Sequence, residues 1–123
     1  MDETVWIARA SKLAEGIPAA AQVEEVELVV LKCKGTIVVF QGVCPHHGAL
    51  LSGGSVDNGM LVCSGHGWRF DCVSGQKAND FSVCLKRFST RIEEDRVGVQ
   101  RMEVQQWKQT AQQQGPPSSQ RWA

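Results

Sequence analysis

Two short glycine-containing segments carry the side chains of this 123-residue chain that are best suited to chemistry. One holds a Cys-x-His motif and the other a Cys-x-x-His motif, and the four candidate ligands are Cys44, His46, Cys63 and His66. Thiolates and neutral imidazoles are ligands of iron–sulfur clusters and of zinc. The residues therefore predict metal binding, with one sulfur and one nitrogen from each segment.

The spacing of the four ligands suits a [2Fe–2S] cluster. Such a cluster has two irons, and each iron needs two protein ligands. A loop with its Cys and His close together can send one ligand to each iron, so two facing loops can hold the cluster between them. Glycine is expected where the backbone approaches a cluster closely or takes a positive φ, and Gly48, Gly65 and Gly67 stand at such places. The motifs together predict one [2Fe–2S] cluster.

Zinc is the competing metal. Zinc fingers usually place two cysteines in one segment and two histidines in another, whereas each segment here mixes the two residue types. A non-redox zinc-binding interaction module is therefore the weaker alternative. The third histidine, His47, follows the ligand His46 directly and is predicted to project away from the same iron toward the surface.

Residues 44–75 resemble the cluster-binding subdomain of Rieske ferredoxins and of the Rieske domains of aromatic-ring oxygenases. The flanking sequences TVWIARASKLAEG and FSVCLKRFSTRIEEDRVGV resemble the same ferredoxins, so the resemblance covers roughly residues 4–100. It implies that Cys44 and Cys63 bind the inner iron, and that His46 and His66 bind the outer, exposed iron.

Three features separate this chain from the Rieske proteins of cytochrome bc complexes, which carry an extra, bridging cysteine in each cluster loop. The matching positions here are Ala49 and Gly65, so no such bridge can form. Those proteins also place Ser and Tyr hydroxyls near the sulfurs, whereas this chain has Trp68 at the Ser position and no tyrosine. Hydrogen bonds to sulfur raise the potential, so we expect a potential near the low end of the Rieske range of about −150 to +300 mV.

The resemblance implies a one-electron carrier between a flavin-dependent reductase and a terminal oxygenase. The chain is not expected to be an enzyme by itself, because an oxygen-activating iron needs two histidines and a carboxylate, and only His47 remains. Partners would dock on an apolar surface around Pro45, His47, Leu50 and Trp68. The alternative is a Rieske domain or small subunit of a larger redox enzyme, either nitrite-reductase-like or fused to a flavoprotein.

The composition is balanced, with 13 basic and 13 acidic residues and a pI near 6.8. Nucleic acid and anionic membranes are therefore not expected partners. The sequence has no apolar run long enough to cross a bilayer, and we expect no signal peptide. We expect a monomer in the cytoplasm. There the three cysteines outside the motifs, Cys33, Cys72 and Cys84, should be reduced and buried, with a disulfide at Cys72 not favoured.

The body of the chain is predicted to be all-β, a Rieske-like sandwich or barrel base with an inserted cluster-binding subdomain of two loops. Residues 1–104 form the domain, with the cluster-binding subdomain at about 42–78. Residues 105–123 are rich in Gln, Pro and Ser and are expected to form a disordered tail or linker. The strands are expected at residues 4–8, 26–32, 36–41, 61–62, 68–71, 81–85, 88–93 and 97–99.

Overall fold

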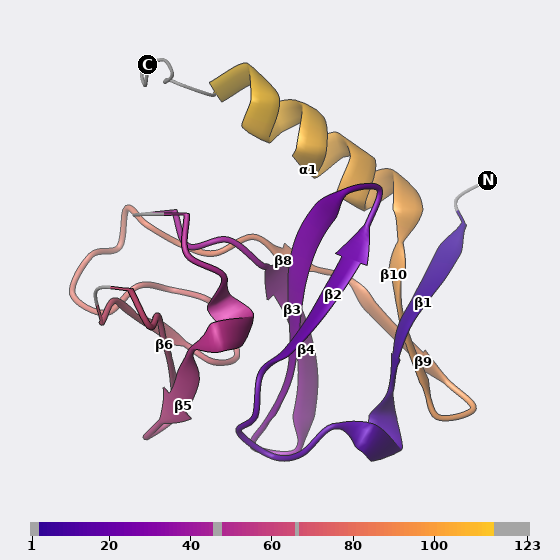
Figure 1. The fold of residues 1–123 in the computed structure, drawn as a ribbon, viewed down its shortest axis with the longest axis horizontal. Coiled ribbons are helices and arrows are strands. Elements are labelled where there is room, and N and C mark those ends of the chain that lie inside the picture. The colour runs from indigo at the N-terminus through magenta and orange to yellow at the C-terminus, as the bar shows by residue number, and fades with distance from the viewer. Residues whose placement is uncertain (1–2, 46–47, 66, 115–123) are drawn as a thin grey trace.

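The computed structural model describes residues 3–45, 48–65 and 67–114, with side chains described up to residue 110. Ten strands form three antiparallel sheets, of orders β1-β10-β9, β2-β3-β4-β8 and β5-β6-β7 (Figure 1). The expected all-β class is confirmed. The strands are β1 (Thr4–Arg9), β2 (Ala19–Val23), β3 (Val26–Cys33), β4 (Thr36–Gln41), β5 (Ser55–Asp57), β6 (Met60–Val62), β7 (Arg69–Asp71), β8 (Arg87–Phe88), β9 (Thr90–Glu93) and β10 (Arg96–Gln100), and the helices are η1 (Ala10–Lys12), η2 (Leu51–Gly53) and α1 (Arg101–Gln114).

The four-stranded sheet lies between two hydrophobic cores. Successive residues of a strand point to opposite faces, so β3 sends Val29 and Leu31 to one core and Leu28 and Val30 to the other. Strand β4 divides its side chains in the same way. Because both faces are covered, these strands are almost continuously apolar rather than alternating.

One of the two cores belongs to the base, where the central sheet packs on β1-β10-β9. The other core joins the central sheet to the small sheet β5-β6-β7 and contains both motif cysteines, Cys44 and Cys63. In Figure 1 the small sheet and its loops lie to the left of the base. The expected insertion of a cluster-binding unit into a β base is therefore present in the fold.

Four tight turns connect neighbouring antiparallel strands through two residues with positive φ. Lys34 and Gly35 form the hairpin turn expected from the sequence, with φ of 54° and 77°. The β2–β3 turn instead uses Glu24 and Glu25, with φ of 54° and 67°. Two-residue turns of this kind match the twist of the strands they join.

The expectation of an irregular tail from Gln105 is wrong as far as Gln114, because α1 runs from Arg101 to Gln114. Gln, Glu, Lys, Met and Ala are good helix formers. Val104 is buried, and Trp107 packs against the base core one turn later. That pair gives the helix an apolar face, which the Gln-rich composition hides. Residues 115–123, including Trp122, lie outside the described residues.

The start of α1 is also held by polar contacts. The Glu103 carboxylate accepts the Ser89 N–H at 2.9 Å and pairs with Lys86 Nζ at 3.1 Å. Further along, Lys108 Nζ donates to the carbonyl oxygen of Glu24 at 3.1 Å. Helix α1 is therefore fixed to the base at the ends of β2 and β8.

Two other expectations on secondary structure need correction. Residues 81–85 form no strand, since the only ladder contact there is a bridge between Gln76 and Cys84. The strand expected at 88–93 is two strands, β8 and β9, which belong to different sheets and are separated at Ser89. Among the described residues, no helix is long and apolar enough to span a bilayer.

Candidate metal centre

The first motif lies in a closed turn between β4 and η2. The Cys44 N–H donates to the Ala49 carbonyl at 2.8 Å, and the Gly48 N–H donates back to the Cys44 carbonyl at 2.9 Å. Gly48 has a φ of 76°, a left-handed conformation that favours glycine. Hydrogen bonds thus tie Cys44 to both Gly48 and Ala49.

The second motif repeats this geometry between β6 and β7. The Cys63 N–H donates to the Trp68 carbonyl at 2.8 Å, and the Gly67 N–H donates to the Cys63 carbonyl at 3.1 Å. Gly67 has a φ of 73°. In both loops the cysteine donates to the residue five positions later and accepts from a left-handed glycine four positions later. The two motifs are therefore equivalent structural units.

The two loops face each other. A Cβ added to Gly65 would lie 3.4 Å from the Cβ of Ala49 and 3.7 Å from Cys63 Sγ. A disulfide needs a Cβ separation of about 3.8 Å, so Ala49 and Gly65 are the pair that a bridging disulfide would join. A Cβ at Gly54 would collide with the carbonyl oxygen of Val62, so the chain between η2 and β5 also packs tightly on β6.

The thiols of Cys44 and Cys63 enter the core from the two loops, and each cysteine is only 2% exposed. His46, His47 and His66 lie outside the described residues. Within the described part of the chain, which holds no histidine, no three His, Cys, Asp or Glu side chains gather to hold a metal ion. Two buried thiols from matching loops fit a cluster held from two sides. They do not fit a zinc finger, where one segment provides both sulfurs.

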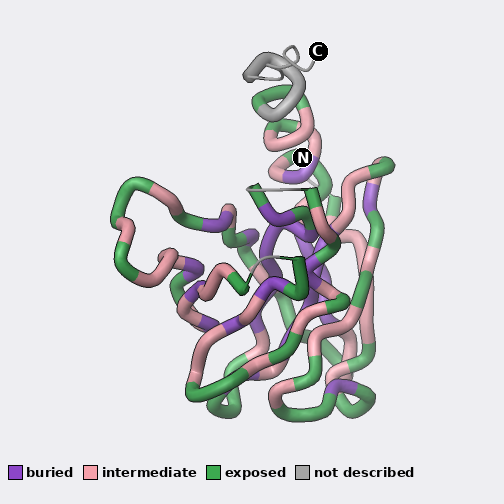
Figure 2. The backbone as a smooth tube through the Cα atoms, turned by 60° about the vertical axis from the view of Figure 1, so that its left-hand side comes forward, coloured by how far each residue is buried: buried purple, intermediate pink, exposed green. Residues whose placement is uncertain are grey.

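A third loop, residues 76–84, projects beside the two motif loops (Figures 1 and 2). The Gln76 side chain braces it by donating to the carbonyl oxygens of Asp80 and Val83, both at 2.9 Å. The Asp80 carboxylate accepts the Ser82 N–H at 3.0 Å and the Ser82 hydroxyl, and both bonds lower the pKa of Asp80. This bracing holds Phe81 outward, 90% exposed.

A groove of about 660 Å³ lies on the other side of the first loop, between that loop and α1. Trp107 and Lys108 line it from the helix, and Val43, Cys44 and Pro45 line it from the loop. The C-terminal helix therefore shapes the surroundings of the first motif, a role that the sequence did not reveal.

Comparison with known proteins identifies the family. A model of the Rieske [2Fe-2S] domain matches residues 3–89. This chain belongs to the Rieske [2Fe–2S] domain family. The ferredoxin component of the alkene monooxygenase system of Xanthobacter autotrophicus (strain ATCC BAA-1158 / Py2) is 32% identical over 96 residues, which are 77% of this chain and 79% of that protein.

Solved structures agree with this assignment. The Sphingomonas yanoikuyae B1 ferredoxin superposes with a TM-score of 0.72 at 25% identity, covering 80% of this chain and 98% of that one. A chain from the complex of reduced oxygenase and oxidized ferredoxin in carbazole 1,9a-dioxygenase superposes with a TM-score of 0.71, also at 25% identity, covering 80% of this chain and 93% of that one. The protein is thus a Rieske ferredoxin, an electron-transfer protein that carries one [2Fe–2S] cluster.

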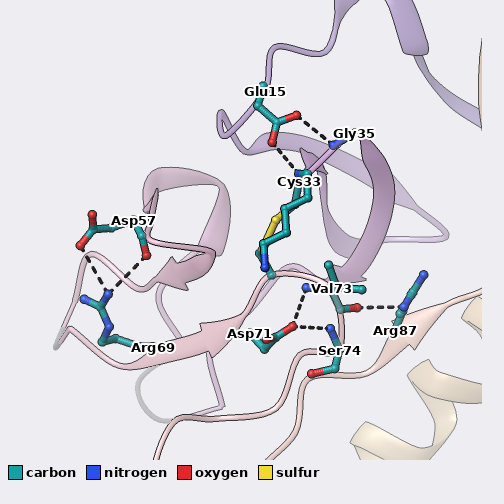
Figure 3. The surroundings of a disulfide bond; sticks show 11 residues. Glu15, Cys33, Gly35, Asp57, Arg69, Asp71, Val73, Ser74 and Arg87 are labelled. Atoms are coloured by element: carbon teal, nitrogen blue, oxygen red, sulfur yellow. Dashed lines mark hydrogen bonds and ion pairs between the residues drawn. A yellow bond between two sulfur atoms is a disulfide. The ribbon is translucent and has the colours of Figure 1, made fainter.

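The cysteines of this Rieske ferredoxin outside the motifs differ from the expectation. Cys33, at the end of β3, and Cys72, just after β7, are buried but joined in a disulfide rather than reduced (Figure 3). Cys84, in the third loop, is exposed rather than buried. The disulfide links the central sheet of the base to the strand that leaves the second motif, because both cysteines face the core shared by these two sheets.

The turn that follows Cys72 is ordered by Asp71, whose carboxylate accepts the N–H groups of Val73 and Ser74, both at 2.9 Å (Figure 3). The bonds from Ser74 and Val73 lower the pKa of Asp71. A carboxylate with a lowered folded-state pKa stabilises the fold above its unfolded pKa, and this contribution is lost as pH falls through the folded pKa. The Asp71 carboxylate therefore stabilises this turn at neutral pH, and acidification removes that stabilisation.

Proposed function

We propose that this Rieske ferredoxin takes one electron from a flavin-dependent reductase and delivers it to a terminal oxygenase. The observation that carries the proposal is the pair of equivalent, facing loops with buried Cys44 and Cys63 thiols in a chain of the Rieske family. The similarity to ferredoxins of oxygenase systems supports the choice of partner.

The four motif residues hold the cluster in this proposal. The Cys44 and Cys63 thiolates would bind one iron, and the His46 and His66 imidazoles would bind the other. When bound, the cluster supplies a centre that takes up and releases a single electron. Trp68 packs against the core that contains both cysteines and excludes water from it. The left-handed Gly48 and Gly67 hold each loop closed, so that the ligands are positioned before an electron arrives.

The proposed potential is low within the Rieske range. The facing positions Ala49 and Gly65 carry no sulfur, the chain contains no tyrosine, and Trp68 stands where a hydroxyl would reach the sulfurs in high-potential relatives. Fewer hydrogen bonds to the cluster leave the added electron less stabilised. A low potential suits donation to an oxygenase. The monomeric state and the cytoplasmic location stay predictions.

A direct test pairs the purified ferredoxin with a flavin-dependent reductase and a terminal oxygenase. The purified ferredoxin should be reduced by the reductase with NADH under argon. The reduced ferredoxin should then be reoxidised when it is mixed with oxidised oxygenase, at least as fast as the oxygenase turns over. Visible absorbance of the ferredoxin follows this reaction. A ferredoxin that accepts electrons but is not reoxidised by the oxygenase would contradict the proposed direction of transfer. A midpoint well above zero would contradict it independently.

Phe81 should be an anchor of the docking surface for the oxygenase. It is a 90% exposed aromatic side chain of the third loop, and Leu50 and Val43 are exposed hydrophobic residues of the first loop, at 48% and 36%. Exposed aromatic side chains contribute strongly when a partner buries them, so Phe81→Ala should raise the KM for ferredoxin about tenfold. The cluster spectrum should not change. Ile92→Ala, at a 52% exposed position on β9, is the matched control and should leave KM unchanged. Equal KM values for both variants would exclude Phe81 from the interface.

A further inference from the structure

Lys77 places a positive charge beside the second motif loop. Its Nζ lies 4.5 Å from the centroid of the Trp68 ring, over the ring face, and donates to the Ala78 carbonyl at 3.4 Å. A cation over the face of Trp is attracted by the ring quadrupole. The ammonium group is therefore held at one place rather than free to sample the surface.

The backbone of Lys77 is fixed to the same unit. Its N–H donates to the Val83 carbonyl at 3.0 Å, and Lys77 bridges to Phe70 on β7. The next residue, Ala78, donates its N–H to the Arg69 carbonyl at 2.9 Å. These contacts with Arg69, Phe70 and Val83 hold Lys77 in a fixed position beside β7.

Trp68 connects this charge to the metal centre. Its carbonyl accepts the Cys63 N–H at 2.8 Å, and its ring packs against the core that contains Cys44 and Cys63. Trp68 also lies 6.3 Å from Phe70, ring centroid to ring centroid, so the ring beneath the Lys77 ammonium is flanked by a second aromatic ring. Apolar groups screen a charge less than water does.

Two other charged groups, on β7 and in the third loop, have hydrogen-bond or ion-pair partners of their own. Arg69 pairs with Asp57 at 3.4 Å. Asp80, in the same loop as Lys77, is an anion that interacts with the Lys77 charge and offsets part of it, while its carboxylate accepts the Ser82 N–H and hydroxyl. Lys77 is therefore the cation that rests on the motif side of the third loop.

We propose that Lys77, held on Trp68, raises the midpoint potential of the cluster. Reduction adds one negative charge, and a fixed cation stabilises the reduced form relative to the oxidised form. Lys77 is a positioning and electrostatic residue, not a ligand. This role compensates in part for the missing hydroxyl donors and sets the driving force for electron delivery. The inference rests on the proposed ligand role of Cys63.

The test is a redox titration of the intact cluster-loaded protein, monitored by electron paramagnetic resonance. Lys77→Met should lower the equilibrium constant for reduction about three- to tenfold, which is a shift of about 30–60 mV to more negative potential at 59 mV per tenfold for one electron. The shift should shrink as salt is raised, because salt screens charges that are partly exposed. Lys77→Arg keeps the charge and should stay near the wild-type potential.

Lys12→Met is the matched control, since it removes the same charge from η1 in the base and should leave the potential unchanged. Equal potentials for wild type and Lys77→Met would overturn the proposal, as would equal shifts for Lys77→Met and Lys12→Met. If Lys77→Met does not retain its cluster, Lys77→Gln replaces it with the same expected shift. A positive wild-type potential would count against the proposed donor function but would leave the Lys77 difference measurable.

Discussion

His66→Ala is expected to abolish the Rieske cluster. One imidazole fewer leaves the outer iron with a single protein ligand, and even changes in groups that merely support metal ligands cost about 10–100-fold in affinity. Iron content should therefore fall roughly tenfold or more, with loss of the visible bands and of the low-average-g resonance signal. His46→Ala should behave in the same way.

His47→Ala provides a control of the same residue type in the same loop. His47 is predicted to project from the loop and not to bind iron, so this variant should keep its iron and its spectrum. A His66→Ala protein with native iron content would show that the ligand assignment is wrong. A His47→Ala protein without iron would show that His47, and not His46, is the iron ligand of the first loop.

The sulfur ligands allow a parallel comparison. Cys44 and Cys63 are each 2% exposed in the core, whereas Cys84 is exposed in the third loop. Cys63→Ser should lose the cluster, while Cys84→Ser should retain it. Burial thus agrees with the motifs in separating the proposed ligand Cys63 from Cys84, a surface thiol that was expected to be buried.

The sequence predicted the motif loops well because short-range spacing determines them. A Cys and a His one or two positions apart, followed by a glycine, constrain a loop that needs few other contacts, and the structure closes both loops at Gly48 and Gly67. The central strands were also predictable, since a run such as VELVVLKC can only be buried on both faces. The histidine positions themselves stay a prediction.

The missed elements depend on signals that composition hides. The β2–β3 turn uses Glu24 and Glu25 in the left-handed region, which lacks the usual Asn-Gly signal, so β2 was not predicted. Among the described side chains of helix α1, Val104 and Trp107 are the two apolar ones that pack on the base core, and they stand among many Gln residues. The β-branched and apolar residues at 81–85 suggested a strand, but the hydrogen bonds of Gln76 and Asp80 hold them in a loop.

The Cys33–Cys72 disulfide could not be predicted because the pairing depends on tertiary structure. The two cysteines are 39 positions apart and come from different sheets, with their Cα atoms 6.2 Å apart. The expected cytoplasmic setting pointed to reduced thiols. The fold packs the end of β3 against the end of β7 in one core. This contact brings Cys33 and Cys72 close enough to bond.

Loss of this disulfide is expected to destabilise the ferredoxin substantially. Closing a 39-residue separation removes conformational entropy from the unfolded chain, which corresponds to about 4 kcal/mol in the chain-entropy model. The Cys33→Ala/Cys72→Ala double variant should therefore unfold at a clearly lower denaturant concentration. Cluster loss should accompany unfolding, because the bond ties the second motif's sheet to the base. Visible circular dichroism during urea titration of the cluster-loaded protein under argon measures both events.

Thiol counting decides whether the bond is present in the isolated protein. After cluster removal and denaturation without reductant, alkylation should modify only the three cysteines outside the disulfide, Cys44, Cys63 and Cys84. All five cysteines would react if no bond forms. Reductant should lower the unfolding midpoint of the wild type and of Cys84→Ser but not that of the double variant. Since reduction acts through this one bond, a midpoint that falls equally in all three proteins would mean that reductant attacks the cluster instead.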